Sequence, residues 1–125
     1  MIAVGGALGA LLRVGVGELA VVLTADTLER SLLTPWVTLA INLLGSIGIG
    51  FLLVFSLQER LGTNLHVFLV IGLLGSFTTF STFSREVLLL FLQGNWQLAG
   101  GYALSGAVIP ILGAALGYAI GTRYA

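Results

Sequence analysis

The chain has 125 residues, of which 58% are hydrophobic and 8% charged, and its formal net charge is zero. Soluble domains carry about a quarter charged residues, so this composition excludes a soluble enzyme and a disordered chain. Lysine is absent, and a chain without a basic patch is not expected to bind nucleic acid. Cysteine is absent too, which excludes disulfides and thiolate metal sites. The composition predicts an all-α integral membrane protein with a single domain over residues 1–125.

Four apolar segments are long enough to cross a bilayer, which takes about 20 helical residues. They cover residues 2–23, 36–57, 66–92 and 98–120. Polar residues mark the connections between the spans. The first connection is predicted from Asp26, Glu29, Arg30, Ser31 and Pro35. An even number of spans predicts that both termini lie on the same side of the membrane.

The arginines outside the spans give little orientation signal. One face carries Arg60, Arg123 and the N-terminal amine, and the other carries Arg30. By the positive-inside rule this difference is too small to fix one orientation. The chain is therefore compatible with insertion in both directions and with an antiparallel homodimer. The alternative is that the weak bias suffices, or that the insertion machinery decides.

Small residues recur four positions apart in three of the spans, a spacing that lets helix backbones approach closely in lipid. The sets are Gly5 and Gly9; Ser46 and Gly50; and Gly113, Gly117 and Gly121. We expect them to support oligomerisation rather than only packing within the chain.

Polar residues inside the spans need partners. Thr38, Asn42 and Ser46 recur every four residues and share one helix face. The Asn42 amide must donate to an anion or to another backbone, because unpaired burial costs a few kcal/mol. Arg13 and Glu18 are expected to have structural roles, and adjacent Arg85 and Glu86 point to different sides.

The third segment contains a cluster of hydroxyl and aromatic residues near its middle, from Gly75 to Ser84. This pattern predicts a broken helix, which is tolerated only where the freed backbone faces protein, water or an ion. Carbonyls released at Gly75 and Thr78 can coordinate a hard cation such as sodium. Phe80 and Phe83 share a face, and their positive ring edges can line the path of a small anion. The alternative is that the hydroxyls bond back to the preceding turn while the rings pack.

The Gly75–Phe83 run, with Gly6–Arg13 and Asn42–Gly45 before it, resembles the CrcB/Fluc family of fluoride channels. The resemblance covers the whole chain, and the Thr-Thr-Phe-Ser-Thr-Phe element is its most specific part. It implies an antiparallel, dual-topology homodimer in the cell (inner or plasma) membrane, with two narrow pores that export fluoride passively. It also implies a central structural sodium ion, bound by the backbone carbonyls of Gly75 and Thr78.

The resemblance assigns further roles residue by residue. Phe80 and Phe83 match the two aromatics whose ring edges line each pore, one from each subunit. Asn42 matches the pore-lining asparagine of the second helix, Thr79 and Ser81 lie beside the polar track, and Tyr102 matches a tyrosine early in the last helix. Arg13 and Glu86 match a vestibule or structural arginine and an acidic residue. Gly106 and Pro110 depart from the pattern, since relatives often carry hydroxyl residues there.

Two other functions compete with this one. A small proton-coupled multidrug transporter is also built as a dual-topology dimer of four-helix chains, and it needs a membrane-embedded carboxylate. Glu18 is the only candidate in the first span, and it lies toward one end with Arg13 nearby. A non-transporting scaffold would explain the small residues but not the break.

Overall fold

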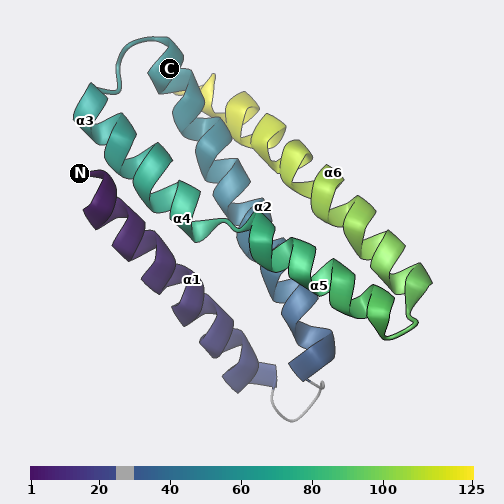
Figure 1. Cartoon of the computed structure of the whole chain (residues 1–125). Coiled ribbons are helices and arrows are strands. Elements are labelled where there is room, and N and C mark those ends of the chain that lie inside the picture. The colour runs from purple at the N-terminus through teal and green to yellow at the C-terminus, as the bar shows by residue number, and fades with distance from the viewer. Residues whose placement is uncertain (25–29) are drawn as a thin grey trace.

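The chain folds as long helices packed side by side (Figure 1). The computed structural model describes residues 1–24 and 30–125, except for the side chains of 30–32. Four stretches are long and apolar enough to cross a membrane: Ile2–Thr24, Leu33–Leu57, Thr63–Leu92 and Trp96–Gly121. The predicted multi-pass, all-helical membrane protein is therefore confirmed, with span limits that differ from the predicted ones by a few residues.

The predicted first connection is too long. Helix α1 (Ile2–Thr24) is followed by α2 (Arg30–Leu57), so Arg30, Ser31 and Pro35 belong to a helix. Asp26 and Glu29 lie outside the described residues. Pro35 lies in the second turn of α2, where its missing N–H removes one helical bond to the Ser31 carbonyl. Its ring also crowds that carbonyl, yet α2 runs through Pro35 to Leu57.

The third span is one segment in the sequence but two helices in space. Helix α3 (Thr63–His66), the π-helix η1 (Val67–Leu74) and α4 (Gly75–Phe77) follow one another with helical backbone angles at their junctions. The backbone becomes extended at Thr78 and Thr79, and α5 (Phe80–Leu92) then begins. The predicted break is therefore present, although Gly75 itself stays helical. The π-helix leaves no signal in the sequence, because every residue of Val67–Leu74 is apolar or glycine and the segment therefore shows no helical period.

Glycines bring helices into backbone contact within the chain. A β-carbon at Gly5 on α1 would lie 3.0 Å from the Leu73 amide nitrogen, and one at Gly50 on α2 would lie 3.0 Å from Ala114 Cα. One at Gly117 on α6 (Trp96–Gly121) would lie 3.0 Å from Ile47 Cα. The small-residue spacing, expected to favour oligomerisation, is thus already used for packing inside one chain, so it gives no separate support for a dimer.

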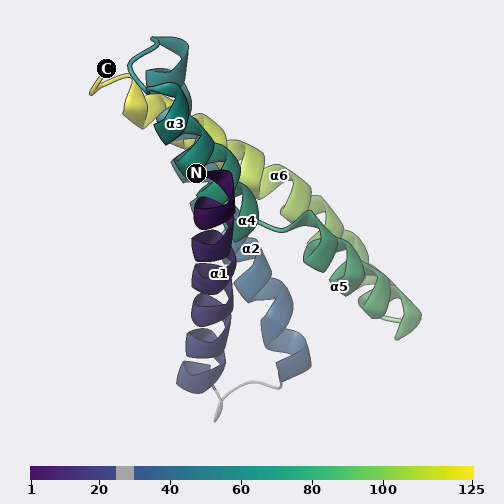
Figure 2. The ribbon, with the colours of Figure 1, turned by 60° about the vertical axis from the view of Figure 1, so that its left-hand side comes forward.

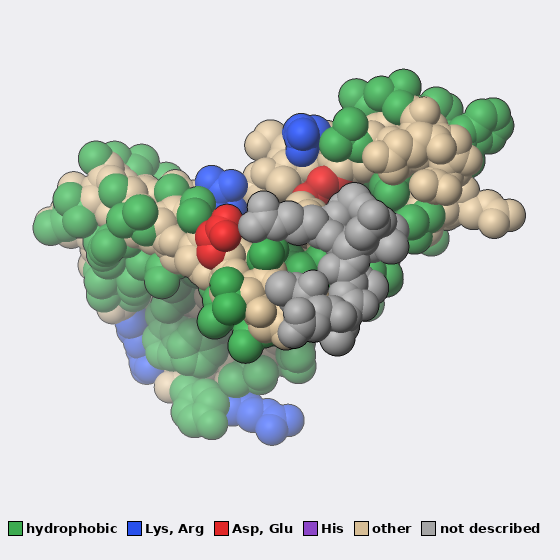
Figure 3. Space-filling view, turned by 90° about the horizontal axis from the view of Figure 1, so that it is seen from below, with side chains coloured by type: hydrophobic (Ala, Val, Ile, Leu, Met, Phe, Trp, Pro, Cys, Tyr) green, Lys and Arg blue, Asp and Glu red, His purple; other side chains and the backbone are tan. Residues whose placement is uncertain are grey.

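The outer surface is apolar along most of the helices. Leu11 and Leu12 on α1 are 68% and 51% exposed, and hydrophobic side chains cover much of the described surface in Figure 3, where charged groups are few. Helix α5 and the first half of α6 diverge from α1 and the first half of α2 (Figure 2). Such a surface is expected of a chain that is covered by lipid or by another protein.

Candidate functional site

The break between α4 and α5 gathers hydroxyl groups at the middle of the third span. Thr78 (φ −76°, ψ 155°) and Thr79 (φ −150°, ψ 114°) are both extended. Thr79 caps α5, since its Oγ1 accepts a hydrogen bond of 3.2 Å from the Thr82 amide. Ser81 Oγ lies 3.3 Å from Thr79 Oγ1. Three hydroxyl residues therefore cluster around the first turn of α5.

Two other hydroxyls of the cluster behave as the alternative interpretation expects. Thr78 Oγ1 donates to the Leu74 carbonyl at 3.0 Å, and Ser84 Oγ donates to the Phe80 carbonyl at 2.9 Å. Back-bonding to the preceding turn thus accounts for Thr78 and Ser84 but not for the capping group around Thr79.

Asn42 on α2 bonds to both backbone groups of Thr79. Its Nδ2 donates to the Thr79 carbonyl at 3.2 Å, and its Oδ1 accepts from the Thr79 amide at 2.8 Å. The sequence leaves two partners open for the Asn42 amide, an anion or another backbone. In the structure the amide bonds to backbone, that of Thr79. Because the Thr79 amide is used in this way, it does not continue the helix onto the Gly75 carbonyl. The Asn42 side chain therefore stabilises the break.

Three aromatic rings follow one another from the break to α6. The rings of Phe80 and Phe83 are 5.6 Å apart and tilted by 50°, and the Phe83 ring meets Tyr102 edge to face at 5.2 Å. Phe83 is 8% exposed and Tyr102 5%, whereas Phe80 is 79% exposed. Phe80 and Phe83 thus share a face, as their spacing predicts, with one ring buried and the other at the surface of the chain.

A buried carboxyl group lies beside Tyr102. Glu86 on α5 is 4% exposed, and it accepts hydrogen bonds from Thr38 Oγ1 at 2.8 Å and from the Tyr102 hydroxyl at 2.6 Å. The sequence singles out Thr38, Glu86 and Tyr102 individually, but it does not show that they meet, because they lie on three different helices. The signal that connects them is that polar groups within a membrane need partners.

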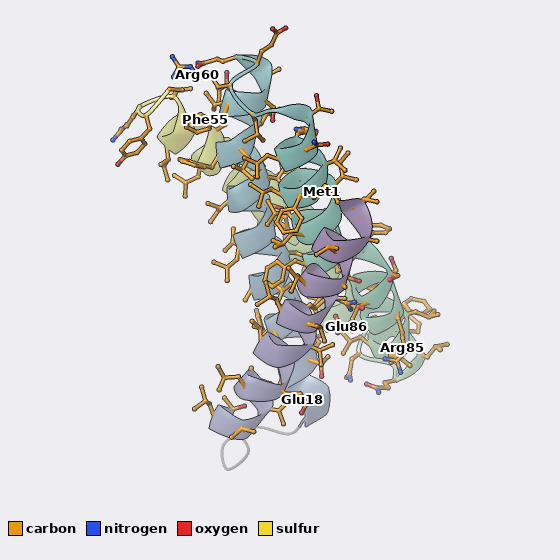
Figure 4. The ribbon with its side chains drawn as sticks, turned by 90° about the vertical axis from the view of Figure 1, so that its left-hand side faces the viewer. Met1, Glu18, Phe55, Arg60, Arg85 and Glu86 are labelled. Carbon is orange, nitrogen blue, oxygen red and sulfur yellow. The ribbon has the colours of Figure 1, made fainter. Side chains whose placement is uncertain are left out.

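The other charged residues of the spans lie apart from this group. Arg85 is exposed although it precedes buried Glu86, so the two do point to different sides. Glu18 is also exposed, and it lies toward the far end of α1 from Met1 (Figure 4). Arg13 is partly buried, and its Nε has no hydrogen-bond partner among the described residues. The buried carboxyl group of the spans is therefore Glu86 rather than Glu18.

Tyr102, Gly106 and Pro110 lie four residues apart on one face of α6. The Phe83 ring lies against Gly106, where a β-carbon would be 2.8 Å from Cδ2 and 2.9 Å from Cζ of the ring. Ser105 uses its hydroxyl on the Tyr102 carbonyl at 3.1 Å. The Ser105 hydroxyl is therefore already used within α6.

Comparison with known proteins finds relatives along almost the whole chain. A family model described as CrcB-like protein, Camphor Resistance (CrcB), matches residues 1–118. A Thermus thermophilus protein named fluoride-specific ion channel FluC is 41% identical over 97% of this chain and 92% of its own length. Proteins of the same name from Novosphingobium aromaticivorans and Chloroflexus aurantiacus are 39% and 41% identical, over 95% and 96% of this chain and 91% of each relative. These relatives are named as channels, not as enzymes.

Proposed function

The chain belongs to the CrcB family, and on that premise we propose that it is a fluoride-selective channel, which lets fluoride leave the cell passively across the inner or plasma membrane. The proposal rests on one observation above all, the break at mid-span where the Phe80–Phe83 ring pair adjoins the hydroxyls of Thr79 and Ser81. Relatives that are named fluoride-specific ion channels support it.

Fluoride is small and strongly hydrated, so a selective pathway has to replace its water with groups of suitable polarity. Ring edges carry positive potential, and hydroxyl groups donate hydrogen bonds. We assign to the pathway Phe80, Phe83, Thr79, Ser81, Asn42 and Tyr102. Glu86 orients the Tyr102 hydroxyl through their 2.6 Å hydrogen bond. Arg13 contributes positive charge that attracts anions to the entrance.

We further propose that two copies assemble as an antiparallel homodimer with two pores. Gly75, Phe80 and Ser81 are exposed on the single chain at the break. Irregular backbone at membrane depth is tolerated only where protein or water covers it. A second copy would cover this exposed side, and the small arginine bias between the two faces permits its inverted insertion.

The same break offers ligands for the structural sodium ion. The Thr79 amide bonds to Asn42 and the Thr82 amide bonds to Thr79 Oγ1, so the carbonyls of Gly75 and Thr78 lose their usual helical donors. Such carbonyls suit sodium, and a bound ion would neutralise their negative ends.

Thr78→Ser is expected to conduct fluoride at nearly the wild-type rate. Serine keeps the backbone carbonyl and also the Oγ bond to Leu74, so only a methyl group is lost. The measurement is the initial rate of fluoride efflux from liposomes, with Thr63→Ser at the start of the span as the control. A large loss of efflux confined to Thr78→Ser would show that the Thr78 side chain, rather than its backbone carbonyl, is required for conduction.

The proposed function itself is tested by loading liposomes with fluoride or chloride and following efflux with ion-selective electrodes. We expect rapid fluoride efflux that needs no proton gradient, with little chloride efflux. Proton-dependent uptake of organic cations, with no passive fluoride efflux, would instead support the multidrug transporter. If the liposomes showed neither fluoride efflux nor uptake of organic cations, the result would support a non-transporting scaffold. Buried Glu86, a membrane-embedded carboxyl group, is the residue on which a transporter would depend.

A further inference from the structure

We propose that Gly106 is a positioning residue for Phe83: because position 106 has no side chain, the phenyl ring lies against the backbone of α6, which determines where the ring edge stands in the pathway. This inference rests on the proposed channel function. It assigns a role to Gly106, a position where the resemblance leads us to expect a hydroxyl residue.

The contact between the two residues leaves no room for a methyl group. A β-carbon at Gly106 would meet Cε2 of the Phe83 ring, and it would lie 2.8 Å from Cδ2 and 2.9 Å from Cζ. Real β-carbons do not approach other atoms so closely, so the ring would have to move. Two other rings contact it, with Phe80 at 5.6 Å and Tyr102 at 5.2 Å between ring centroids, and the Phe83 side chain is buried.

Beside position 106, the hydrogen-bonding side chains of α6 are already engaged: the Tyr102 hydroxyl donates to Glu86. Pro110 has no N–H, so the Gly106 carbonyl four residues earlier lacks its usual donor. The nearby Ser105 hydroxyl is bonded to the Tyr102 carbonyl. Position 106 therefore acts through its shape, by accepting the flat ring of Phe83 against the helix.

The orientation of this ring matters because its edge and its face have opposite potentials. A ring turned out of its place on Gly106 would present more of its negative face to an anion. It would also lose the edge-to-face contact with Tyr102, which is bonded to Glu86. A side chain at position 106 is thus expected to change permeation even where the fold is kept.

Gly106→Ala tests the inference, with Gly100→Ala on the same helix as the matched control. A β-carbon at Gly100 meets no atom within 4 Å. Alanine favours helix over glycine by about 1 kcal/mol, so any loss at position 106 comes from the contact. We expect Gly106→Ala to lower the fluoride efflux rate per assembled channel by roughly ten- to a hundredfold, as displacement of a functional group by about 1 Å can do. Equal rates in the two variants would overturn the inference.

A second measurement identifies the ring as the group that is displaced. Thermal unfolding is compared for Gly106→Ala alone, Phe83→Ile alone and the double variant. We expect Gly106→Ala to lower the unfolding midpoint when Phe83 is present and not when isoleucine leaves room beside position 106. Equal shifts in both backgrounds would overturn the inference.

The same comparison decides the case in which Gly106→Ala does not assemble. Recovery of assembly by the double variant supports the contact with the ring, and failure to recover contradicts it. If the wild-type protein does not conduct fluoride, the proposed function fails, and the unfolding comparison still reports whether Gly106 accommodates Phe83.

Discussion

Replacement of Phe83 or Phe80 by isoleucine is expected to lower fluoride efflux on the order of a hundredfold, comparable with the loss of one preorganised electrostatic contact in a dry site. Isoleucine remains apolar, but it has no ring edge to face an anion. The two rings lie 5.6 Å apart next to the break, which places both ring edges where the proposed pathways pass. The measurement is the initial efflux rate from liposomes, normalised to assembled protein.

The two variants are expected to differ in stability. Phe83 is 8% exposed and packs against Tyr102, so its replacement also removes core contacts, whereas Phe80 is 79% exposed on the single chain. Phe91→Ile is the matched control, because Phe91 lies on the same helix and stacks on Trp96 away from the break. Wild-type rates in both Phe80→Ile and Phe83→Ile would contradict the assignment of the pathway.

Asn42→Ala is expected to abolish most fluoride efflux and to destabilise the chain by a few kcal/mol. The substitution removes the hydrogen bonds of 3.2 Å and 2.8 Å that pair the Asn42 amide with the Thr79 backbone. Each unpaired group within the membrane costs about 1–3 kcal/mol, and the break loses the contact that fixes it to α2. The measurements are the unfolding midpoint in detergent and the efflux rate. Asn64→Ala, at an exposed position near the start of the third span, is the control.

The two measurements together separate the roles of the Asn42 amide. Loss of both stability and flux supports its action through the Thr79 backbone. Loss of flux with the unfolding midpoint unchanged would instead indicate that Asn42 donates directly to the ion. If neither changes, the Asn42–Thr79 pair does not maintain the break.

Several features of the site were predictable because they depend on neighbours along the chain. The break follows from the hydroxyl cluster after Gly75, and the shared face of Phe80 and Phe83 follows from their three-residue spacing. Pro35 shows the limit of such local reasoning, because it marks a loop in the sequence pattern but lies within a helix.

The sequence by itself determined that this chain crosses the membrane four times and breaks its third span, because apolar length and local polar clusters act within single segments. Only the tertiary structure decided which partners the polar groups take: Asn42 bonds to Thr79, 37 residues away, and Thr38 to Glu86, 48 residues away. It also decided that the glycines pack inside the chain and that Gly106 accommodates Phe83. The physical reason is that these contacts join different helices, so they depend on how the helices approach one another in space rather than on any pattern along the chain.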